Sequence, residues 1–157
     1  MRLLKDQDLS SKNVVLRLDL NVPILDKQVL DSTRIISSVP TIKYLINKNC
    51  KVLLTSHLGR PQEDKFDINF SMRPVAEKLS EILKHEIDLI DSLDSSDIFN
   101  TTQIQLLENL RFLVGEKDNS EVLGNQLANK GDVYIFDAFG TAHRKQASTY
   151  SAIQQAK

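Results

Sequence analysis

The heptapeptide Val14-Val-Leu-Arg-Leu-Asp-Leu20 is an apolar, β-branched run with two charged side chains, Arg17 and Asp19, near its end. Runs of similar length and character recur at residues 51–55, 87–90, 104–107 and 132–136. Such short apolar runs are typical of strands buried on both faces of a parallel sheet. The sequence pattern therefore predicts an α/β domain with a mainly parallel sheet of about five strands, the first over 14–20.

The segments between these runs have the period of amphipathic helices. Residues 34–47 place apolar side chains at helical spacing, and Asp31 or Ser32 is suited to cap the N-terminus. Pro40 lies inside this segment, so we expect it to kink the helix or to mark its true start. Further helices are predicted over 72–85, 120–129 and 149–157. A helix after the fifth strand normally leads into another strand, so we expect the domain, residues 1–157, to lack a last edge strand at its C-terminal end.

Composition limits the classes of protein that this chain can represent. It has 157 residues, 41% of them hydrophobic, and 20 Lys+Arg against 21 Asp+Glu, which suits one soluble domain and argues against nucleic-acid or membrane partners. The single cysteine, Cys50, allows neither an internal disulfide nor a CxxC pair, so a reducing, cytoplasmic setting fits best. The longest hydrophobic run, 133–136, is too short for a signal sequence or a transmembrane helix.

The residues with the clearest chemistry follow the predicted strands, where ligands of open parallel sheets bind. Five of the seven arginines lie at or just beyond the strand ends or at the start of the first helix, together with two of the three histidines. These residues are Arg17, Arg34, Arg60, Arg111 and Arg144, with His57 and His143. A guanidinium offers fixed, paired donors to phosphate or carboxylate. The cluster is therefore suited to a small polyanion.

Asp19 and Asn21 add a second requirement on the ligand. A carboxylate beside so much positive charge can accept a hydrogen bond from a hydroxyl, and an amide can both donate and accept. We therefore expect a phosphorylated hydroxy acid. Taken singly, these residues also have structural interpretations: one arginine at a loop end is usually solvated, His57 equally suits a structural hydrogen bond, and Gly59 and Gly140 suit turns with positive φ.

The glycines do not form a nucleotide-binding motif. An α/β nucleotide site usually places glycines between a strand and the following helix. The five glycines, at 59, 115, 124, 131 and 140, match neither GxGxxG nor GxxxxGK(S/T), and the connection after the first strand, 21–32, contains none. We therefore predict that this domain does not hold ATP.

Five motifs stand in order along the chain: Arg17-Leu-Asp-Leu-Asn-Val-Pro23, Asp31-Ser-Thr-Arg-Ile35, Ser56-His-Leu-Gly-Arg-Pro61, Leu107-Glu-Asn-Leu-Arg-Phe112 and Asp137-Ala-Phe-Gly-Thr-Ala-His-Arg144. Together they resemble the phosphoglycerate kinase family, and the similarity runs over essentially the whole sequence. The resemblance implies a three-layer αβα, Rossmann-like domain, namely the N-terminal, phosphoglycerate-binding domain of a two-lobed enzyme. It also implies a full-length monomer whose C-terminal lobe, absent here, binds Mg-ATP or Mg-ADP, with no cofactor or metal on this chain.

The resemblance also implies roles for individual residues. Arg34 matches the catalytic arginine, which would stabilise charge on the moving phosphoryl group. Substrate-binding roles are implied for Asp19, Asn21, Arg34, His57, Arg60, Arg111 and Arg144, with Arg17 and His143 as accessory members of the basic patch. The implied reaction, a step of glycolysis and gluconeogenesis, transfers a phosphoryl group reversibly between 1,3-bisphosphoglycerate and ADP, giving 3-phosphoglycerate and ATP. Because the two substrates bind different lobes, we expect this chain to bind 3-phosphoglycerate but not to catalyse alone.

Two positions depart from the family pattern. Phe136 stands where the family usually has asparagine, and Gln146 stands where it usually has histidine. Both departures bear on the polar network behind the fifth strand and on the pose of Arg144.

Two other classes of protein stay open. One is a haloacid-dehalogenase-like phosphohydrolase with Asp19 as nucleophile, although Asn21 cannot serve as the general acid that such a family places two residues later. The other is a non-catalytic polyanion-binding module that has the arginine cluster and no kinase lobe.

Overall fold

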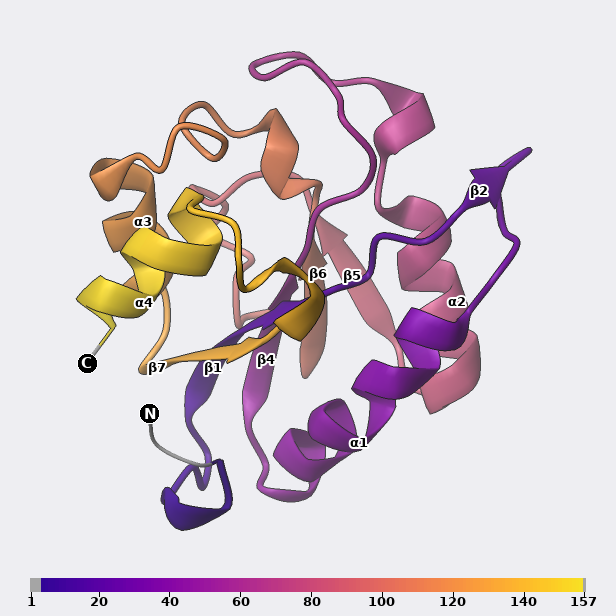
Figure 1. Cartoon of the computed structure of the whole chain (residues 1–157). Coiled ribbons are helices and arrows are strands. Elements are labelled where there is room, and N and C mark those ends of the chain that lie inside the picture. Colours follow the sequence, from indigo (N-terminus) through magenta and orange to yellow (C-terminus); the bar gives the residue numbers. More distant parts are fainter. Residues whose placement is uncertain (1–3, 157) are drawn as a thin grey trace.

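Five parallel strands form the central sheet of the computed structural model, which describes residues 4–156. The strands are β1 (Asn13–Leu18), β4 (Lys51–Thr55), β5 (Ile87–Ile90), β6 (Ile104–Leu107) and β7 (Val133–Asp137), in the spatial order β5-β6-β4-β1-β7 (Figure 1). The five strands predicted from the sequence are confirmed, with shifts of one or two residues at both ends of β1 and of β7. β1 stops at Leu18, so Asp19 lies in the connection that follows, and β7 extends to Asp137.

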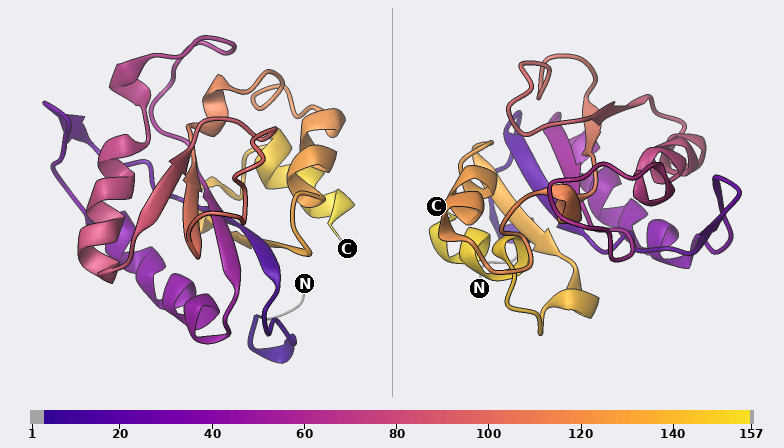
Figure 2. Two further views of the ribbon diagram at one scale, coloured as in Figure 1. Left: turned by 180° about the vertical axis from the view of Figure 1, so that it is seen from behind. Right: turned by 90° about the horizontal axis from the view of Figure 1, so that it is seen from above.

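The strands are apolar on both faces because helices cover both faces of the sheet. Leu16 of β1 belongs to the core formed with α1 (Thr33–Asn47) and α2 (Arg73–Leu83). Its neighbour Val15 points the other way, into the core formed with α3 (Glu121–Ala128) and α4 (Ala152–Gln155). The result is the three-layer αβα, Rossmann-like arrangement expected from the sequence (Figure 2).

The first helix differs from the prediction at its start. α1 begins at Thr33 and continues through Pro40, so the expectation that Pro40 marks the true start is wrong. Ser32 occupies the N-cap position without a side-chain cap bond. The carboxylate of Asp31 caps the N-terminus of α1 instead, because it accepts hydrogen bonds from the Thr33 backbone N–H at 2.8 Å and the Thr33 hydroxyl at 2.6 Å.

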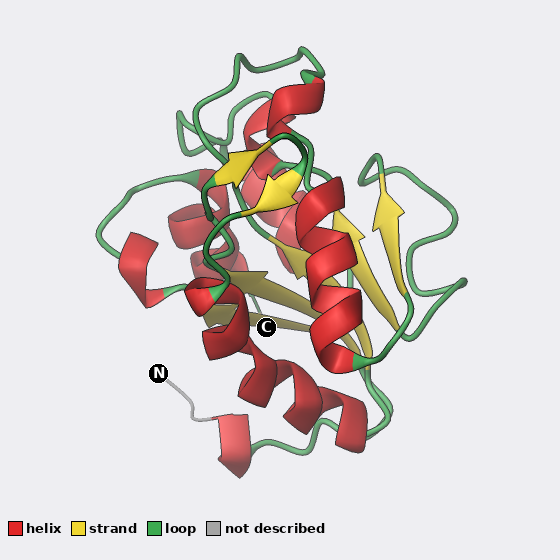
Figure 3. Cartoon of the chain, turned by 90° about the vertical axis from the view of Figure 1, so that its right-hand side faces the viewer, coloured by secondary structure: helices red, strands yellow, loops and turns green. Residues whose placement is uncertain are grey.

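A short hairpin was not predicted from the sequence. β2 (Ile24–Leu25) pairs antiparallel with β3 (Gln28–Val29), and this pair stands apart from the main sheet (Figure 3). The two turn residues, Asp26 and Lys27, have φ of 50° and 61°. Hairpin turns of this kind usually contain glycine or asparagine, so Asp-Lys gives only a weak signal in the sequence.

The C-terminal helix starts earlier than predicted. A π-helical turn covers Ala147–Ser151 and leads into α4, whereas the sequence predicts one helix over 149–157. Residue 157 lies outside the described part of the chain. Within residues 4–156 the structure contains no helix with the length and apolar character needed to cross a membrane.

β1 lies between two strands, β4 and β7, that the chain reaches over opposite faces of the sheet. α1 connects β1 to β4 over one face of the sheet, whereas α3 leads the chain to β7 over the opposite face. In open α/β sheets, ligands bind at the carboxyl ends of the strands where the connections change face in this way. The carboxyl end of β1, where Arg17 lies, is therefore the expected location of a site.

Candidate functional site

Three predicted residues, Arg17, His57 and Arg111, lie together beneath the surface at the carboxyl edge of the sheet. We call them the site floor. Their exposed fractions are 0%, 2% and 5%, respectively. One comes from β1, one follows β4 and one lies in the short 3₁₀ helix Leu110–Phe112 after β6. Parallel strands end at the same edge of a sheet, and this brings together side chains that are far apart in the sequence.

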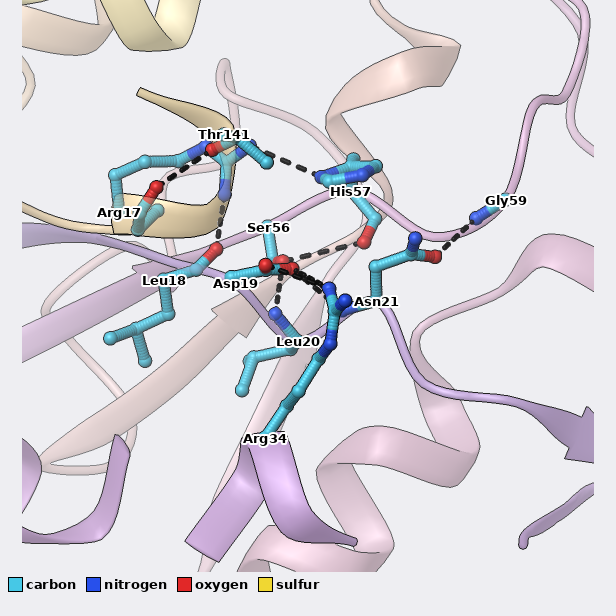
Figure 4. A network of polar contacts seen from close by, with 11 residues as sticks. Arg17, Leu18, Asp19, Leu20, Asn21, Arg34, Ser56, His57, Gly59 and Thr141 are labelled. Atoms are coloured by element: carbon cyan, nitrogen blue, oxygen red, sulfur yellow. Dashed lines mark hydrogen bonds and ion pairs between the residues drawn. The ribbon is translucent and has the colours of Figure 1, made fainter. Parts of the chain in front are cut away.

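Arg17 is held by hydrogen bonds from all three of its side-chain nitrogens. Nε donates to the Ser148 hydroxyl at 3.0 Å, one terminal nitrogen donates to the Leu18 carbonyl, and the other lies 3.2 Å from Nδ1 of His57 (Figure 4). Burial lowers the pKa of this guanidinium, and the charges of Glu116 and Asp19 oppose that effect. The arginine charge is thus fixed in one place inside the protein.

His57 is uncharged at neutral pH. Burial lowers its pKa to about 3, and the positive charges of Arg17 and Arg111 act in the same direction. Because Arg17 is a donor, Nδ1 of His57 must accept the bond between them, which assigns the ring hydrogen to Nε2. The histidine can therefore offer one N–H donor to a ligand without adding a charge.

Arg111 has a buried nitrogen with no hydrogen-bond partner among the described residues. Its terminal nitrogen donates to the Gly59 carbonyl at 2.6 Å, but Nε contacts no acceptor. A buried donor that stays unpaired costs free energy, about 1–3 kcal/mol. The charges that act on Arg111 include those of Arg144, Arg60 and Arg17, and with burial they lower its pKa. Arg111 therefore has one hydrogen-bond donor inside the floor that no described group uses.

Asn109 holds the two segments that carry His57 and Arg111. Its Oδ1 accepts hydrogen bonds from the backbone N–H groups of Leu58 and Arg111, and its Nδ2 donates to the carbonyls of Leu58 and Phe70. The side chain is 1% exposed, so all four bonds are shielded from water. Asn109 thereby fixes the segment after β4 against the segment after β6.

Asp19 and Arg34 point toward each other just beyond the end of β1 (Figure 4). One terminal nitrogen of Arg34 lies 2.7 Å and 2.8 Å from the two carboxylate oxygens of Asp19. The Asp19 side chain is 16% exposed and that of Arg34 is 52% exposed. The predicted carboxylate at the end of the first strand therefore has a cationic partner, which offsets the cost of its partial burial.

Backbone geometry brings Asn21 and two glycines close to this pair. Oδ1 of Asn21 accepts a hydrogen bond from the Gly59 backbone N–H at 2.9 Å, which leaves its amide nitrogen for other partners. Gly59 has φ of 59°, in the left-handed region, as a turn glycine does. Gly140 does not have a positive φ, so the turn interpretation is wrong for it. A Cβ at Gly140 would instead lie 2.7 Å from Oδ2 of Asp19, so the close approach to this carboxylate requires glycine.

The remaining predicted residues lie at the surface. Arg60 is exposed and Arg144 is half-buried, and the charges of both act on Arg111. We call Arg34, Arg60 and Arg144 the site rim. His143 is exposed, and no described side-chain hydrogen bond joins it to the floor. The structure therefore brings the predicted residues to one edge but leaves His143 at its outside.

Two buried polar residues beneath the floor, Glu116 and Ser148, were not found from the sequence. Glu116, 1% exposed, accepts hydrogen bonds from the backbone N–H and the hydroxyl of Ser148 at 3.0 Å and 2.6 Å. The Tyr134 hydroxyl donates to the Ser148 carbonyl at 2.6 Å. Burial raises the pKa of Glu116. The only available signal was a lone glutamate five residues after Arg111, which in a sequence looks like an ordinary surface charge.

The two departures from the family pattern do not interrupt these contacts. Phe136 pairs with Arg17 in the register of β7 and β1 and is half-buried. The Gln146 backbone N–H donates to the Thr149 hydroxyl, which in turn donates to the Arg144 carbonyl at 2.6 Å. The polar network behind β7 is formed by Glu116 and its partners, without either side chain.

The fold and the site define an α/β domain with a basic, arginine-lined sheet edge suited to a small polyanion. Comparison with known proteins narrows this class to one family. The family model described as phosphoglycerate kinase matches residues 4–157, so the chain belongs to the phosphoglycerate kinase family. This membership excludes the haloacid-dehalogenase-like alternative. The geometry agrees, because Asp19, the nucleophile of that alternative, forms an ion pair with Arg34, and Asn21 accepts a hydrogen bond from the Gly59 backbone N–H.

Relatives of known sequence or structure support the assignment. Proteins named phosphoglycerate kinase from Francisella tularensis subsp. holarctica and Desulfovibrio desulfuricans are each 46% identical to this chain, over 94% and 98% of its length. The solved phosphoglycerate kinase of Coxiella burnetii is 38% identical with a TM-score of 0.91 over 98% of the chain. That of Pyrococcus horikoshii OT3 is 31% identical with a TM-score of 0.81 over 94%. The chain spans 38% or 39% of the length of each of these proteins.

Proposed function

We propose that this chain carries the phosphoglycerate-binding site of a phosphoglycerate kinase, beyond the carboxyl ends of β1, β4 and β6. The observation that carries the proposal is the site floor, in which Arg17 and Arg111 are buried beside a neutral His57 and Nε of Arg111 has no partner among the described residues. Positive charge taken out of water is costly unless it is paired. The floor is therefore suited to a ligand that brings phosphate or carboxylate oxygens.

Asp19, Asn21 and the arginines of the floor and rim together recognise the rest of the ligand. A carboxylate has about four acceptor positions, so Asp19 can accept a hydrogen bond from a ligand hydroxyl while it is bound to Arg34. The free amide nitrogen of Asn21 can donate to the carboxyl end of a glycerate. Arginines offer paired donors to phosphate oxygens, a role we assign to Arg111 and Arg144 with Arg60. A phosphorylated hydroxy acid, 3-phosphoglycerate or 1,3-bisphosphoglycerate, meets these demands together.

Phosphoryl transfer depends on positioning and on charge stabilisation rather than on covalent chemistry by the protein. Arg34 is exposed and pairs with Asp19 just after β1, and it is the residue that we assign to stabilising negative charge on the phosphoryl group in transit. His57 donates from Nε2 and stays neutral. Asp19 holds Arg34 in place before the ligand arrives.

The nucleotide is expected outside this chain. No described group of three or more His, Cys, Asp or Glu side chains is arranged to hold a metal ion, and the glycine motifs of nucleotide sites are missing from the sequence. When bound to the complete enzyme, Mg-ADP or Mg-ATP accepts or supplies the phosphoryl group. We propose that a C-terminal lobe of a monomeric, cytoplasmic enzyme provides that site, and that this chain alone binds without turnover.

Calorimetric titration with 3-phosphoglycerate tests the proposal. We expect the chain to bind 3-phosphoglycerate, inorganic phosphate more weakly, and ATP not measurably. Arg111→Met removes one charged donor from the floor and should weaken 3-phosphoglycerate binding about a hundredfold. The matched control is Arg73→Met, because Arg73 is exposed at the start of α2 and lies beside β5.

The outcomes separate the competing interpretations. If titration with 3-phosphoglycerate shows no heat of binding, the proposed site is wrong. Equal affinity for 3-phosphoglycerate and inorganic phosphate would support a non-catalytic polyanion-binding module. Equal effects of Arg111→Met and Arg73→Met would show that the floor is not the binding point.

A further inference from the structure

Glu116 is a buried carboxylate that is bound by Ser148 and lies close to the site floor. Both of its oxygens are bound by Ser148, one to the hydroxyl and one to the backbone N–H. Glu116 is 1% exposed and Ser148 is 0% exposed. A buried charge is costly to fold into a protein, and Glu116 is close enough to Arg17 and Arg111 for its charge to act on both.

A directed chain of hydrogen bonds leads from Glu116 to the floor. Its carboxylate can only accept, so the Ser148 hydroxyl donates its hydrogen to Glu116. The hydroxyl oxygen is then free to accept from Nε of Arg17. Arg17 donates from its other end to Nδ1 of His57, which keeps the ring hydrogen on Nε2 (Figure 4). We call these four residues the Glu116 relay.

We propose that Glu116 is a positioning residue of the anion site, which acts through Ser148 and Arg17 to fix the orientation and the hydrogen of His57. The proposal deepens the proposed function, since it concerns how the same site is organised for its phosphorylated ligand. Glu116 touches no ligand itself. Its charge sets the direction of the Ser148 hydroxyl, and this leaves the Ser148 oxygen to accept from Arg17 and to hold it against Nδ1 of His57. A neutral group at position 116 would allow the hydroxyl to turn toward Arg17, where one donor would meet another.

Electrostatics and positioning predict opposite effects for loss of the Glu116 charge. The site binds an anion, so a nearby negative charge weakens binding by repulsion. Glu116→Gln removes that repulsion and would tighten binding if charge alone mattered. If Glu116 positions Arg17 and His57, the same substitution weakens binding although the site gains positive charge. A purely structural role would lower stability and leave the affinity of the folded protein unchanged.

Glu108 provides a matched control. It is also buried, at 7% exposed, and it also accepts hydrogen bonds from a serine hydroxyl, that of Ser71 at 2.7 Å, and from a backbone N–H, that of Met72 at 2.6 Å. These bonds hold the start of α2. Glu108→Gln therefore changes the same chemical group in a similar environment, without contact with the relay.

The experiment measures the affinity for 3-phosphoglycerate by calorimetry and the folded fraction by circular dichroism. We expect Glu116→Gln and Ser148→Ala each to weaken binding about tenfold, and Glu108→Gln to leave it within about twofold. Because Glu116 and Ser148 act through one path, the double variant should bind no more than about twofold more weakly than either single variant. Tighter or unchanged binding by Glu116→Gln overturns the proposal, as does an equal loss in Glu108→Gln.

A second readout keeps the proposal testable on its own. Heteronuclear NMR of the His57 ring nitrogens should show a single neutral form with hydrogen on Nε2 in the parent chain. In Ser148→Ala, Arg17 loses the partner that holds it against Nδ1, so a mixture of both neutral forms is expected. If Glu116→Gln does not fold, Ser148→Ala decides, because it keeps the charge and removes the link. An unchanged His57 spectrum in the folded Ser148→Ala variant overturns the relay. If the parent chain fails to bind 3-phosphoglycerate, the proposed function is wrong. The NMR comparison needs no ligand, so it still tests the Glu116 relay in that case.

Discussion

The site floor and the site rim hold their arginines under opposite conditions. Arg17 and Arg111 are 0% and 5% exposed, and groups of the same chain bind both terminal nitrogens of Arg17 and one terminal nitrogen of Arg111. The Arg34 side chain is 52% exposed, and the one partner described for it is Asp19. Order in the floor is established when the protein folds, whereas a rim arginine can exchange its partner when a ligand or a second lobe arrives.

This difference assigns separate tasks to the two regions. A preorganised floor lowers the entropy that is lost on binding, so it is suited to recognise the part of the ligand that does not move. A group that stabilises a phosphoryl in transit must instead meet charge that develops only during the reaction. The rim is the region with that freedom. Floor variants should therefore alter affinity and stability, and rim variants should alter affinity or turnover with little effect on stability.

The largest expected effect is on turnover, from Arg34 of the rim. In an enzyme that includes the nucleotide-binding part, Arg34→Ala should lower kcat about a thousandfold, because one charge that stabilises the transition state contributes about 4 kcal/mol. KM for 3-phosphoglycerate should change much less. Steady-state kinetics measures both.

Arg60→Ala is the matched control for Arg34→Ala, because Arg60 is also an exposed rim arginine. Its loss should raise KM and leave kcat nearly unchanged. If Arg34→Ala raised KM as much as it lowered kcat, Arg34 would be a binding residue and the division of tasks within the rim would be wrong.

A smaller effect is expected on stability, from Asn109 beneath the floor. Asn109→Ala leaves the buried backbone groups of Leu58, Phe70 and Arg111 without their side-chain partners. We expect the free energy of unfolding to fall by about 3 kcal/mol, as measured by urea denaturation.

The control for this prediction is Asn100→Ala. Asn100 is exposed and donates to the Ser96 carbonyl, so its loss should change the free energy of unfolding by less than about 0.5 kcal/mol. Similar losses in both variants would mean that the floor is not held more firmly than the surface.

Most of the fold was predictable because buried parallel strands give continuous apolar runs in the sequence. Val14–Leu16 and Lys51–Thr55 have this character, and both lie within strands of the sheet. The hairpin at Ile24–Val29 was not predictable, because its turn residues, Asp26 and Lys27, carry no glycine signal. The extent of α1 was misjudged at Pro40, since packing of the helix against the sheet outweighs the hydrogen bond that proline removes.

Part of the site was predictable: its arginines could be found from the sequence, but the buried Glu116 beneath them could not. Arginines that follow strands converge at one edge whatever their spacing in the sequence, so Arg17, Arg111 and Arg144 could be grouped. Glu116 could not be placed, because a buried carboxylate is recognised by its partners, and Ser148 lies 32 residues further along the chain. Contacts of this kind depend on tertiary structure alone.

The smallest expected effect is a pH dependence that belongs to the floor. The folded pKa of His57 is about 3 and its ordinary value is 6.5, so below pH 6.5 the unfolded chain binds a proton that the folded chain does not. The contribution of the neutral, buried His57 to the free energy of unfolding is therefore fully present above pH 6.5. It is lost progressively as the pH falls toward 3, because protonation of His57 then stabilises the unfolded chain. Glu116, whose pKa is raised by burial, titrates in both the parent chain and a His57→Gln variant, so its effect cancels in their difference.

Between pH 6.5 and pH 5, the free energy of unfolding of the parent chain should therefore fall by about 1.5 kcal/mol more than that of His57→Gln. Denaturation by urea at each pH measures both values. Parallel profiles would mean that His57 is charged in the folded chain at pH 5, as an exposed histidine would be. His57 would then belong with the rim, and the floor would lack the neutral donor on which its difference from the rim depends.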